Sequence, residues 1–388
     1  MSYGIEQYSL LNVGKIIAGP GSIGAIQDVA AELKAAKVLI ITDMGVWNAG
    51  LVEKPAALLT EQGIQVDVIN STPPEPTVEQ ANGIINAAKA FQSELIIGIG
   101  GGSSMDVAKL TAVMLTNTVS LSELVKGAVL VNKSVPTVMV PTTAGTGAEV
   151  TPNAIVLVPE DELKVGIVSS KMMSDYVILD PELTMKLPPA ITASTGMDAL
   201  SHAIECYISQ KANPFSDTFA LKAIQLIGGS IRRAYYNGQD IQARHDMLLG
   251  ALFGGICIAT SSTVAVHALA YPLGGKYRIA HGLSNAILLP HVMNFNLAVC
   301  EDKFKDIAHA MGIEVAGLSE RQAAEKMIEN LYSLIRDLEI HVDLQQKGIH
   351  ESDIDSMADA ALKVTRLLNN NPKPMNKEDI KTIYKKLF

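Results

Sequence analysis

The chain is poor in cysteine, tryptophan and basic residues. Its 388 residues include three cysteines, one tryptophan, and 31 Lys and Arg against 40 Asp and Glu, which gives a formal net charge of −9. Because Cys206, Cys257 and Cys300 are odd in number and widely spaced, they form neither a disulfide framework nor a CxxC zinc site, and they indicate reduced thiols. The acidic balance argues against nucleic acid or an anionic membrane surface as a partner.

Long apolar runs are also missing. No stretch reaches the length of a membrane span, and the first residues lack the basic and apolar segments of a signal peptide. We therefore expect a cytoplasmic protein. With 48% hydrophobic and 18% charged residues, a chain of this length can bury two separate cores, which favours a two-domain globular enzyme.

Strand and helix patterns alternate in the first half of the chain and stop near the pair Pro188-Pro189. This alternation predicts a Rossmann-like α/β domain with a parallel sheet. The long runs rich in Ala, Leu and Met that follow predict an all-α domain. We therefore expect a dinucleotide-binding domain at 1–188 and a helical, metal-binding domain at 189–388. The predicted strands are Val38–Thr42, Val66–Ile69, Leu95–Ile99 and Val135–Val140, and a predicted helix is Val78–Phe91.

A glycine-rich turn follows the third of these strands. Gly100, Gly101 and Gly102 precede a helix that is expected to start at Ser103, with Ser103 and Asp106 as a capping box. The glycines let backbone N–H groups approach an anion, and the helix N-terminus adds partial positive charge. The turn therefore predicts a pyrophosphate cradle, with a purely structural tight turn as the alternative.

A second loop of small residues, Pro141–Thr151, follows the fourth strand. Two such loops at the carboxyl ends of strands predict a ligand site in an open α/β sheet, whereas a plain turn-rich loop is the alternative. Asp43 stands at the end of the first strand. A carboxylate there suits the ribose hydroxyls of NAD and repels the 2′-phosphate of NADP, although a helix cap is equally consistent with it.

Four polar residues lie in segments that are otherwise Ala, Leu, Ile, Gly and Val. Asp198 and His202 are spaced to share one face of a helix, His267 lies in a second helical run, and His281 opens a third segment. Each alone could be an ordinary polar residue, but buried charges need partners or a metal. One carboxylate and three imidazoles suit Fe(II) or Zn(II) better than Mg or Ca.

Taken together, these segments resemble the iron-containing (group III) alcohol dehydrogenases, the family that includes lactaldehyde reductase and 1,3-propanediol dehydrogenase. The resemblance implies a dehydroquinate synthase-like architecture, hydride transfer between NAD(P) and a small alcohol or aldehyde, a metal acting as Lewis acid, and a homodimer or larger homo-oligomer. It is carried by the motifs Gly100–Lys109, Pro141–Thr151, Leu179–Thr184, Gly196–Glu205 and His281–His291.

The resemblance also assigns site residues. It implies NAD, with NADP less favoured, and Fe(II), with Zn(II) as the alternative metal. The metal ligands would be Asp198, His202, His267 and His281, the last also in the catalytic set. The cofactor contacts would be Asp43, Gly101, Gly102, Ser103, Asp106, Thr142, Thr143, Thr146, Asn153 and Lys164.

Two positions depart from the family pattern. Tyr271 stands where lactaldehyde reductases carry a histidine, four residues after His267, that is a proposed proton-relay group. With an ordinary pKa near ~10, a tyrosine is a poor base at neutral pH, so Tyr271 is a candidate catalytic residue whose proton route is open. Ile258 replaces a phenylalanine and indicates a roomier substrate cavity.

The substrate is expected to be small and neutral. Arg232, Arg233 and Arg244 stand in polar surroundings that predict solvated faces, so we expect no cationic clamp for a carboxylate in the helical half. The sequence does not distinguish iron from zinc.

Two alternative functions remain. A glycerol dehydrogenase-like zinc polyol dehydrogenase shares the architecture, but its ligand set differs from Asp/His/His/His. A non-catalytic nucleotide- or metal-binding protein would have no need for two sites that converge.

Overall fold

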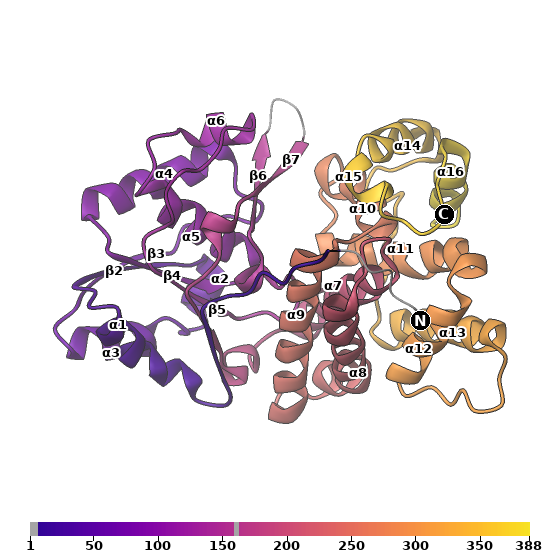
Figure 1. The fold of residues 1–388 in the computed structure, drawn as a ribbon, viewed down its shortest axis with the longest axis horizontal. Coiled ribbons are helices and arrows are strands. Elements are labelled where there is room, and N and C mark those ends of the chain that lie inside the picture. Colours follow the sequence, from indigo (N-terminus) through magenta and orange to yellow (C-terminus); the bar gives the residue numbers. More distant parts are fainter. Residues whose placement is uncertain (1–6, 159–162) are drawn as a thin grey trace. The chain divides into compact units, whose positions relative to one another are not determined.

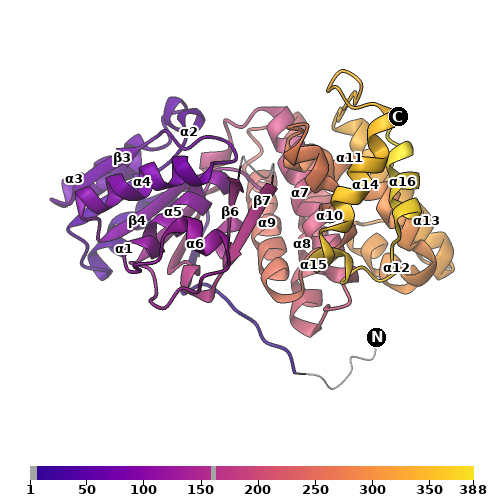
Figure 2. The ribbon, with the colours of Figure 1, turned by 90° about the horizontal axis from the view of Figure 1, so that it is seen from above.

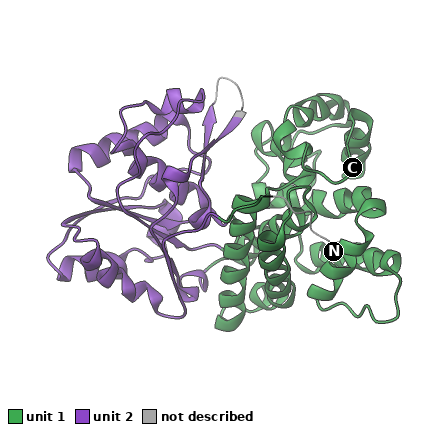
Figure 3. Ribbon diagram, in the orientation of Figure 1, with its two compact units in different colours: residues 1–10, 144–146, 187–388 green, residues 11–143, 147–186 purple. Residues whose placement is uncertain are grey.

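The structure is a computed structural model that describes residues 7–158 and 163–388, and it divides into two compact units (Figure 3). The α/β unit comprises residues 11–143 and 147–186. The helical unit comprises residues 144–146 and 187–388, together with the N-terminal segment that ends at Leu10. Residues 144–146 thus belong by their contacts to the helical unit, although they stand in the middle of the α/β sequence.

Six parallel strands form the sheet of the α/β unit, in the order β1-β8-β5-β4-β2-β3, which confirms the predicted parallel sheet. Every residue of β4 and β5 is buried, as expected for strands covered on both faces. The strands are β1 (Lys15–Ala18), β2 (Lys37–Ile41), β3 (Gln65–Ile69), β4 (Leu95–Gly100), β5 (Thr137–Pro141) and β8 (Tyr176–Leu179).

Helices cover both faces of this sheet, with α1 and α3 on one side and α4 and α5 on the other (Figure 1). The predicted helix at Val78–Phe91 is α4, which starts with a capping box between Thr77 and Gln80. The helices are α1 (Ile26–Glu32), α2 (Met44–Asn48), α3 (Glu53–Glu61), α4 (Val78–Phe91), α5 (Gly102–Met114) and α6 (Leu121–Val125). Short 3-10 turns are η1 (Ser22–Ala25), η2 (Ala148–Val150), η4 (Ser170–Met172) and η5 (Pro181–Thr184), and β6 (Asn153–Val158) pairs with β7 (Leu163–Val168) in an antiparallel hairpin.

The strand order reverses between β2 and β4. From β2 the chain goes to β3 on one side and then returns to β4 on the other. Open α/β sheets bind ligands outside the carboxyl ends of the strands at such a reversal. In this unit the reversal brings together the residues that follow β2 and β4, namely Asp43 and the glycine turn.

Helices make up the second unit, which confirms the predicted all-α half (Figure 2). Pro189 and Pro214 occupy the first positions of α7 and α8, where proline fits a helix start. The helices are α7 (Pro189–Ile208), α8 (Pro214–Tyr236), α9 (Ile241–Ser261), α10 (Ala265–Gly275), α11 (His281–Asn296), α12 (Glu301–Ala310), α13 (Glu320–Asp337), α14 (Ile354–Leu362), α15 (Thr365–Leu368) and α16 (Lys377–Lys385), with 3-10 turns η6 (Leu297–Val299) and η7 (Glu351–Asp353).

From Gly196 onward α7 is buried on every side, because it packs against α8, α9 and α11. All three cysteines are buried free thiols in this unit, and Cys206 belongs to its core as a packing residue. Among the described residues, no single helix is long and apolar enough to cross a membrane, and only the bent pair α9 and α10 reaches that length and composition together.

The prediction that Arg244 lies on a solvated face is wrong. Arg244 is only 2% exposed, and its guanidinium donates hydrogen bonds to the Thr192 hydroxyl at 2.7 Å and to the Gly238 carbonyl at 3.0 Å. A hydroxyl and backbone carbonyls satisfy the buried cation. Because these partners are distant in the sequence or belong to the backbone, the polar neighbours of Arg244 did not indicate that this side of α9 faces the interior.

The crossing of α8 and α9 depends on Gly250. A Cβ atom at Gly250 would lie 2.5 Å from Cγ1 of Ile227, whereas a Cβ atom at Gly229 on α8 would meet nothing within 4 Å. We expect Gly250→Ala to destabilise the protein by about 1–3 kcal/mol through overpacking. Gly229→Ala should be neutral or stabilising by up to about 1 kcal/mol. Denaturant unfolding of both variants measures this, and equal stabilities would contradict the expectation.

Candidate active site

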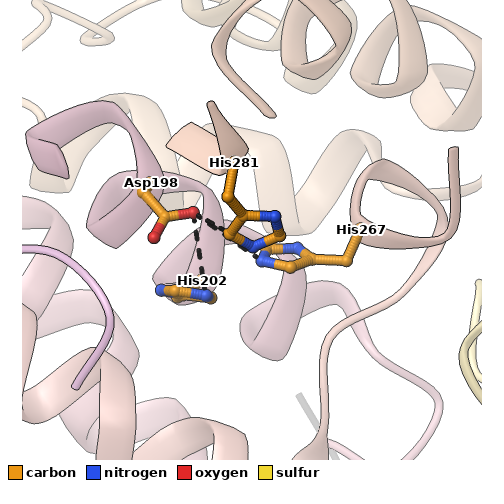
Figure 4. Close-up of side chains that lie close together, drawn as sticks. All are labelled: Asp198, His202, His267 and His281. Atoms are coloured by element: carbon orange, nitrogen blue, oxygen red, sulfur yellow. Dashed lines mark ion pairs between the residues drawn. The ribbon is translucent and has the colours of Figure 1, made fainter. Parts of the chain in front are cut away.

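Three helices of the helical unit bring Asp198, His202, His267 and His281 together (Figure 4). Asp198 and His202 lie one turn apart on α7, His267 is the third residue of α10, and His281 is the first residue of α11. Oδ1 of Asp198 lies 3.9, 3.9 and 3.7 Å from the Nε2 atoms of the three histidines in that order. The four potential ligand atoms all lie within 4.8 Å of one another.

This cluster has the chemistry of a transition-metal site. Asp198, His202 and His267 are 3–5% exposed, whereas the side chain of His281 is 34% exposed. One carboxylate and three imidazoles that converge at this spacing suit a single Zn(II) or Fe(II) ion. The residues present therefore fit a divalent metal, with His281 on the more accessible side of the cluster.

The electrostatics favour the ligand form of Asp198, His202 and His267. Burial alone would raise the pKa of the Asp198 carboxyl, but the three histidines and a neighbouring amide outweigh it and hold that pKa below its usual range. Burial lowers the pKa of His202 to about 4 and that of His267 to about 4, against the opposing charge of Asp198. Metal ligands must be ionised carboxylates and neutral imidazoles, and both forms prevail at neutral pH.

Two buried groups that the sequence reasoning missed contact these ligands. Nδ2 of Asn285 donates to Asp198 Oδ1 at 2.7 Å and lies 3.1 and 3.2 Å from the Nε2 atoms of His267 and His281. The carboxyl group of Glu205 contacts Nδ1 of His267. The spacing in the sequence could have pointed to both residues. Asn285 stands four residues after His281 and Glu205 stands seven after Asp198, each at helical spacing from a ligand.

The glycine turn of the α/β unit is shaped as predicted, but the predicted capping box is wrong. Helix α5 begins at Gly102 with Gly101 as its N-cap, and no side chain caps it. Asp106 instead accepts from the Ile155 N–H at 3.0 Å and pairs with Lys109 at 3.0 Å. These stronger partners draw the carboxylate away from the helix start, so the N–H groups of the first turn have no side-chain cap and are oriented for an anion.

Gly100 cannot be replaced by a larger residue without strain. Its φ of 155° lies in the region that favours glycine. A Cβ atom there would meet Ser104 Oγ at 2.7 Å and Asp43 Oδ2 at 3.1 Å. The close approach of the two strand ends thus depends on this glycine.

Asp43 caps α2 and also lies beside the glycine turn. Its Oδ1 accepts from the Val46 N–H at 3.0 Å, and its Oδ2 accepts from Ser104 Oγ at 3.2 Å. The helix-cap role that the sequence left open is therefore present in the structure. The carboxylate also stands at the reversal of strand order, where the ribose role requires it.

The threonine loop divides between the two units. Thr142 is buried, with its N–H donating to the Gly100 carbonyl at 3.0 Å, and Thr143 lies 3.5 Å from the Cβ position of Gly101. Thr146 belongs to the helical unit. The structure thus brings Thr142 and Thr143, but not Thr146, into one unit with the glycine turn.

Lys109, which is fully buried, anchors the end of this loop. Its Nζ donates to the Ala148 carbonyl at 2.8 Å, to the Thr151 carbonyl at 3.3 Å and to the carbonyl of Asn153. The backbone of Asn153, the first residue of β6, is thereby tied to α5.

Lys164 already has a partner within the α/β unit. Its ammonium group pairs with Glu75, and the N–H of Glu75 donates to Ser103 Oγ at 3.2 Å. Lys164 and Ser103 are therefore linked through Glu75, a residue that no sequence motif marked.

Tyr271 lies one turn after His267 on α10 and is half-buried. Burial raises the pKa of its phenol, against the positive charge of Arg366, which also acts on His267. The helical half therefore does hold a cation near the candidate metal ligands. Sequence reasoning missed Arg366 because no motif marks it.

The α/β unit with its uncapped glycine turn and the helical unit with its carboxylate–imidazole cluster have the parts that a metal-dependent dehydrogenase requires. Two protein-family models match the sequence. The one described as iron-containing alcohol dehydrogenase matches residues 14–181, and the one described as Fe-containing alcohol dehydrogenase family, C-terminal, matches residues 192–388.

Named relatives cover the whole chain. The chain is 39% identical over 387 residues to long-chain-alcohol dehydrogenase 1 of Geobacillus thermodenitrificans (strain NG80-2), covering 97% of this chain and 98% of that protein. It is 37% identical over 390 residues to 1,3-propanediol dehydrogenase of Klebsiella pneumoniae, covering 100% of both. A crystal structure of 1,3-propanediol oxidoreductase matches with a TM-score of 0.95 and 36% identity, over 99% of this chain and 100% of that one.

The chain therefore belongs to the iron-containing alcohol dehydrogenase family, and the resemblance inferred from its motifs is confirmed. It is an alcohol dehydrogenase by family, and this function fits the findings better than a polyol dehydrogenase of the glycerol dehydrogenase type or a non-catalytic binding protein.

The position of His281 depends on Gly282. A Cβ atom at Gly282 would lie 2.2 Å from the Ser194 carbonyl oxygen of α7, so we expect Gly282→Ala to push α11 away and weaken metal binding by roughly 10-fold or more. Gly254→Ala is the control, because its Cβ would make ordinary 3.5 Å contacts beside His202. Competition with a chelator for Zn(II) measures both affinities, and unchanged binding by Gly282→Ala would contradict this dependence.

Proposed function

We propose that this chain is an NAD-linked alcohol dehydrogenase and aldehyde reductase that holds one Fe(II) ion, with Zn(II) as the alternative metal, on Asp198, His202, His267 and His281. The observation that carries the proposal is the convergence of four ligand atoms within 4.8 Å inside a helical core. We also propose a homodimer or larger homo-oligomer, as the family resemblance implies, and a cytoplasmic location, as expected from the sequence.

The chain's own residues prepare the site for this chemistry. When bound, the metal supplies Lewis acidity toward the oxygen of the alcohol or aldehyde, and the nicotinamide accepts or supplies the hydride. Asp198 adds one negative charge, so a divalent site keeps a net positive charge. The lowered pKa values of His202 and His267 keep both imidazoles neutral at neutral pH, so each ring has one nitrogen lone pair free for ligation.

Tyr271 serves as a hydrogen-bond donor in this proposal. Because burial raises the pKa of its phenol, the hydroxyl keeps its proton at neutral pH and is unsuited to act as a base. One helical turn from His267, it would donate toward an oxygen held at the cluster.

The α/β unit would bind the dinucleotide. The pyrophosphate would accept hydrogen bonds from the N–H groups at Gly101, Gly102 and Ser103, because no side chain caps this helix start. Asp43 would contact the adenosine ribose and disfavour NADP by charge repulsion. Thr142 and Thr143 would border the adenine and ribose, Thr146, Asn153 and Lys164 would complete the contacts, and Asp106 would support them through its hold on β6.

The substrate would be a small alcohol and aldehyde pair. The two named relatives differ in substrate by name, long-chain alcohols and 1,3-propanediol, so the family alone leaves chain length open. Ile258 in place of an aromatic residue favours a roomier cavity. Arg366 adds a positive charge beside His267 and Tyr271, so aldehydes with an anionic end belong beside neutral ones in any test.

The test is oxidation of NADH and NADPH with a panel of neutral and anionic aldehydes of increasing length. The protein is reconstituted with Fe(II) without oxygen and, in parallel, with Zn(II). We expect aldehyde-dependent turnover with NADH that falls at least about 100-fold in Asp198→Ala and in His281→Ala, because each loses a metal ligand. His309→Ala, an exposed histidine of α12, is the matched control and should keep the activity.

Either of two results would overturn the proposal. One is no turnover with any metal by protein that binds NADH. The other is full activity in both ligand variants, which would show that the cluster has no part in the reaction.

Asp43 should set the choice of nucleotide. Asp43→Asn keeps a residue that caps helices well but removes the charge, so we expect the preference for NADH over NADPH in kcat/KM to fall about 10-fold, since ~1.4 kcal/mol of relieved repulsion corresponds to that factor. Asp240→Asn removes the charge of another N-cap aspartate, on α9, and should leave the preference unchanged. An unaltered ratio in Asp43→Asn would refute the assignment.

A further inference from the structure

Glu205 is a buried carboxyl group that has no part in the proposed reaction. It lies on α7, three residues after His202 and seven after Asp198, and it is 0% exposed. Positions separated by three and seven residues lie on the same side of a helix. Glu205 is therefore on the side of α7 that carries the two metal ligands, at the next turn along.

Both oxygens of this carboxyl group are engaged by α10. Oε2 contacts Nδ1 of His267, and Oε1 accepts from the N–H of Val266 at 2.6 Å and from that of Val264 at 3.2 Å. Helix α10 starts at Ala265, and its N-cap Val264 provides no side-chain hydrogen bond. Glu205 thus caps α10 from another helix, where its ionised form would also complement the helix dipole.

Burial raises the pKa of the Glu205 carboxyl group to about 8, and a cation bound at the cluster would favour its ionised form. That form decides which ring nitrogen of His267 carries the proton. If Nδ1–H donates to the carboxylate, Nε2 must keep its lone pair, and Nε2 is the atom that faces Asp198 at 3.9 Å. Outer carboxylates of this kind fix the tautomer and orientation of metal-bound histidines and raise their basicity. Here the same carboxyl group also holds the backbone that carries the ring.

We propose that Glu205 is a positioning residue that holds His267, by ring and by backbone, in the orientation and tautomer that a divalent metal requires. The inference rests on the proposed function, because it assumes that His267 is a metal ligand. Glu205 ties α10 to α7, so three of the four ligands are fixed relative to one another before any metal binds.

Glu205→Gln tests this role with almost no change of shape. An amide has one acceptor and one donor. If its N–H₂ faces His267, the ring must accept at Nδ1 and carry its proton on Nε2, which then cannot bind a metal. If its oxygen faces His267, the N–H₂ group opposes the N–H groups of Val264 and Val266.

The matched control is Asp306→Asn. Asp306 on α12 accepts from the hydroxyl of Tyr207, also on α7, at 2.7 Å. This variant removes a carboxylate that bonds the same helix without touching a candidate ligand.

The measurement is binding of Co(II), followed by its visible absorption, and of Zn(II), by chelator competition, on the full-length chain without nucleotide. We expect Glu205→Gln to bind both ions roughly 10–100-fold more weakly, the range typical of lost outer partners of metal ligands. The Co(II) spectrum should change, and Asp306→Asn should stay within about twofold of the parent in both readouts.

A double substitution separates action through His267 from general damage. In a His267→Ala background, adding Glu205→Gln should cost less than about twofold more affinity, because the ligand it positions is already gone. If Glu205→Gln does not fold, Glu205→Asp replaces it, since it keeps the charge and shortens the reach, and it should bind with intermediate affinity.

The outcomes distinguish this inference from the proposed function. Parent protein that binds neither ion would refute the metal site itself. Parent-like affinity and spectrum in Glu205→Gln, or in Glu205→Asp where that variant is used, would refute the positioning role and leave the metal site standing. A full additional loss in the His267→Ala background would show that Glu205 acts on the fold rather than through His267.

Discussion

The helical unit is organised around an ionised carboxylate in an apolar core. Asp198 is 3% exposed among alanines, leucines and isoleucines of α7 and its neighbours, and such a charge is costly to bury without partners. Its partners come from α10 and α11 as well as from α7 itself. The crossing of these three helices therefore has to satisfy Asp198, and glycine at position 282 is what lets α11 approach closely enough to do so.

In the α/β unit, by contrast, the candidate site would bind an anion through backbone groups. Its candidate site offers N–H groups at the start of α5, without a side-chain cap, where strand order reverses. The acidic and basic side chains near this turn are paired with one another, Asp106 with Lys109 and Lys164 with Glu75. An anion would meet helix N–H groups on one side and Asp43 on the other, which suits a phosphate joined to a neutral sugar better than a second phosphate.

Much of this arrangement could be predicted from the sequence, for identifiable reasons. The apolar runs of β2 to β5 marked the sheet, and the spacing of Asp198 and His202 placed two ligands on one helix. The four-residue strands β1 and β8 gave no periodic signal. Contacts between distant segments, such as that of Glu205 with His267, could not be predicted either, because local patterns do not show which elements meet. The Ser103–Asp106 cap failed for the same reason, since Lys109 and Ile155 hold that aspartate instead.

The positions of the cysteines allow the unfolding of the two units to be followed separately. All three thiols lie in the helical unit, buried, and burial raises the pKa of each, that of Cys300 to about 12. A thiol-reactive dye reacts with exposed thiolate, so it should leave the folded chain unlabelled. The rate of labelling would thus record the opening of the helical unit alone, while tryptophan emission from Trp47, in the α/β unit, would follow the other half. One unmodified chain therefore carries separate reporters for the unfolding of its two units.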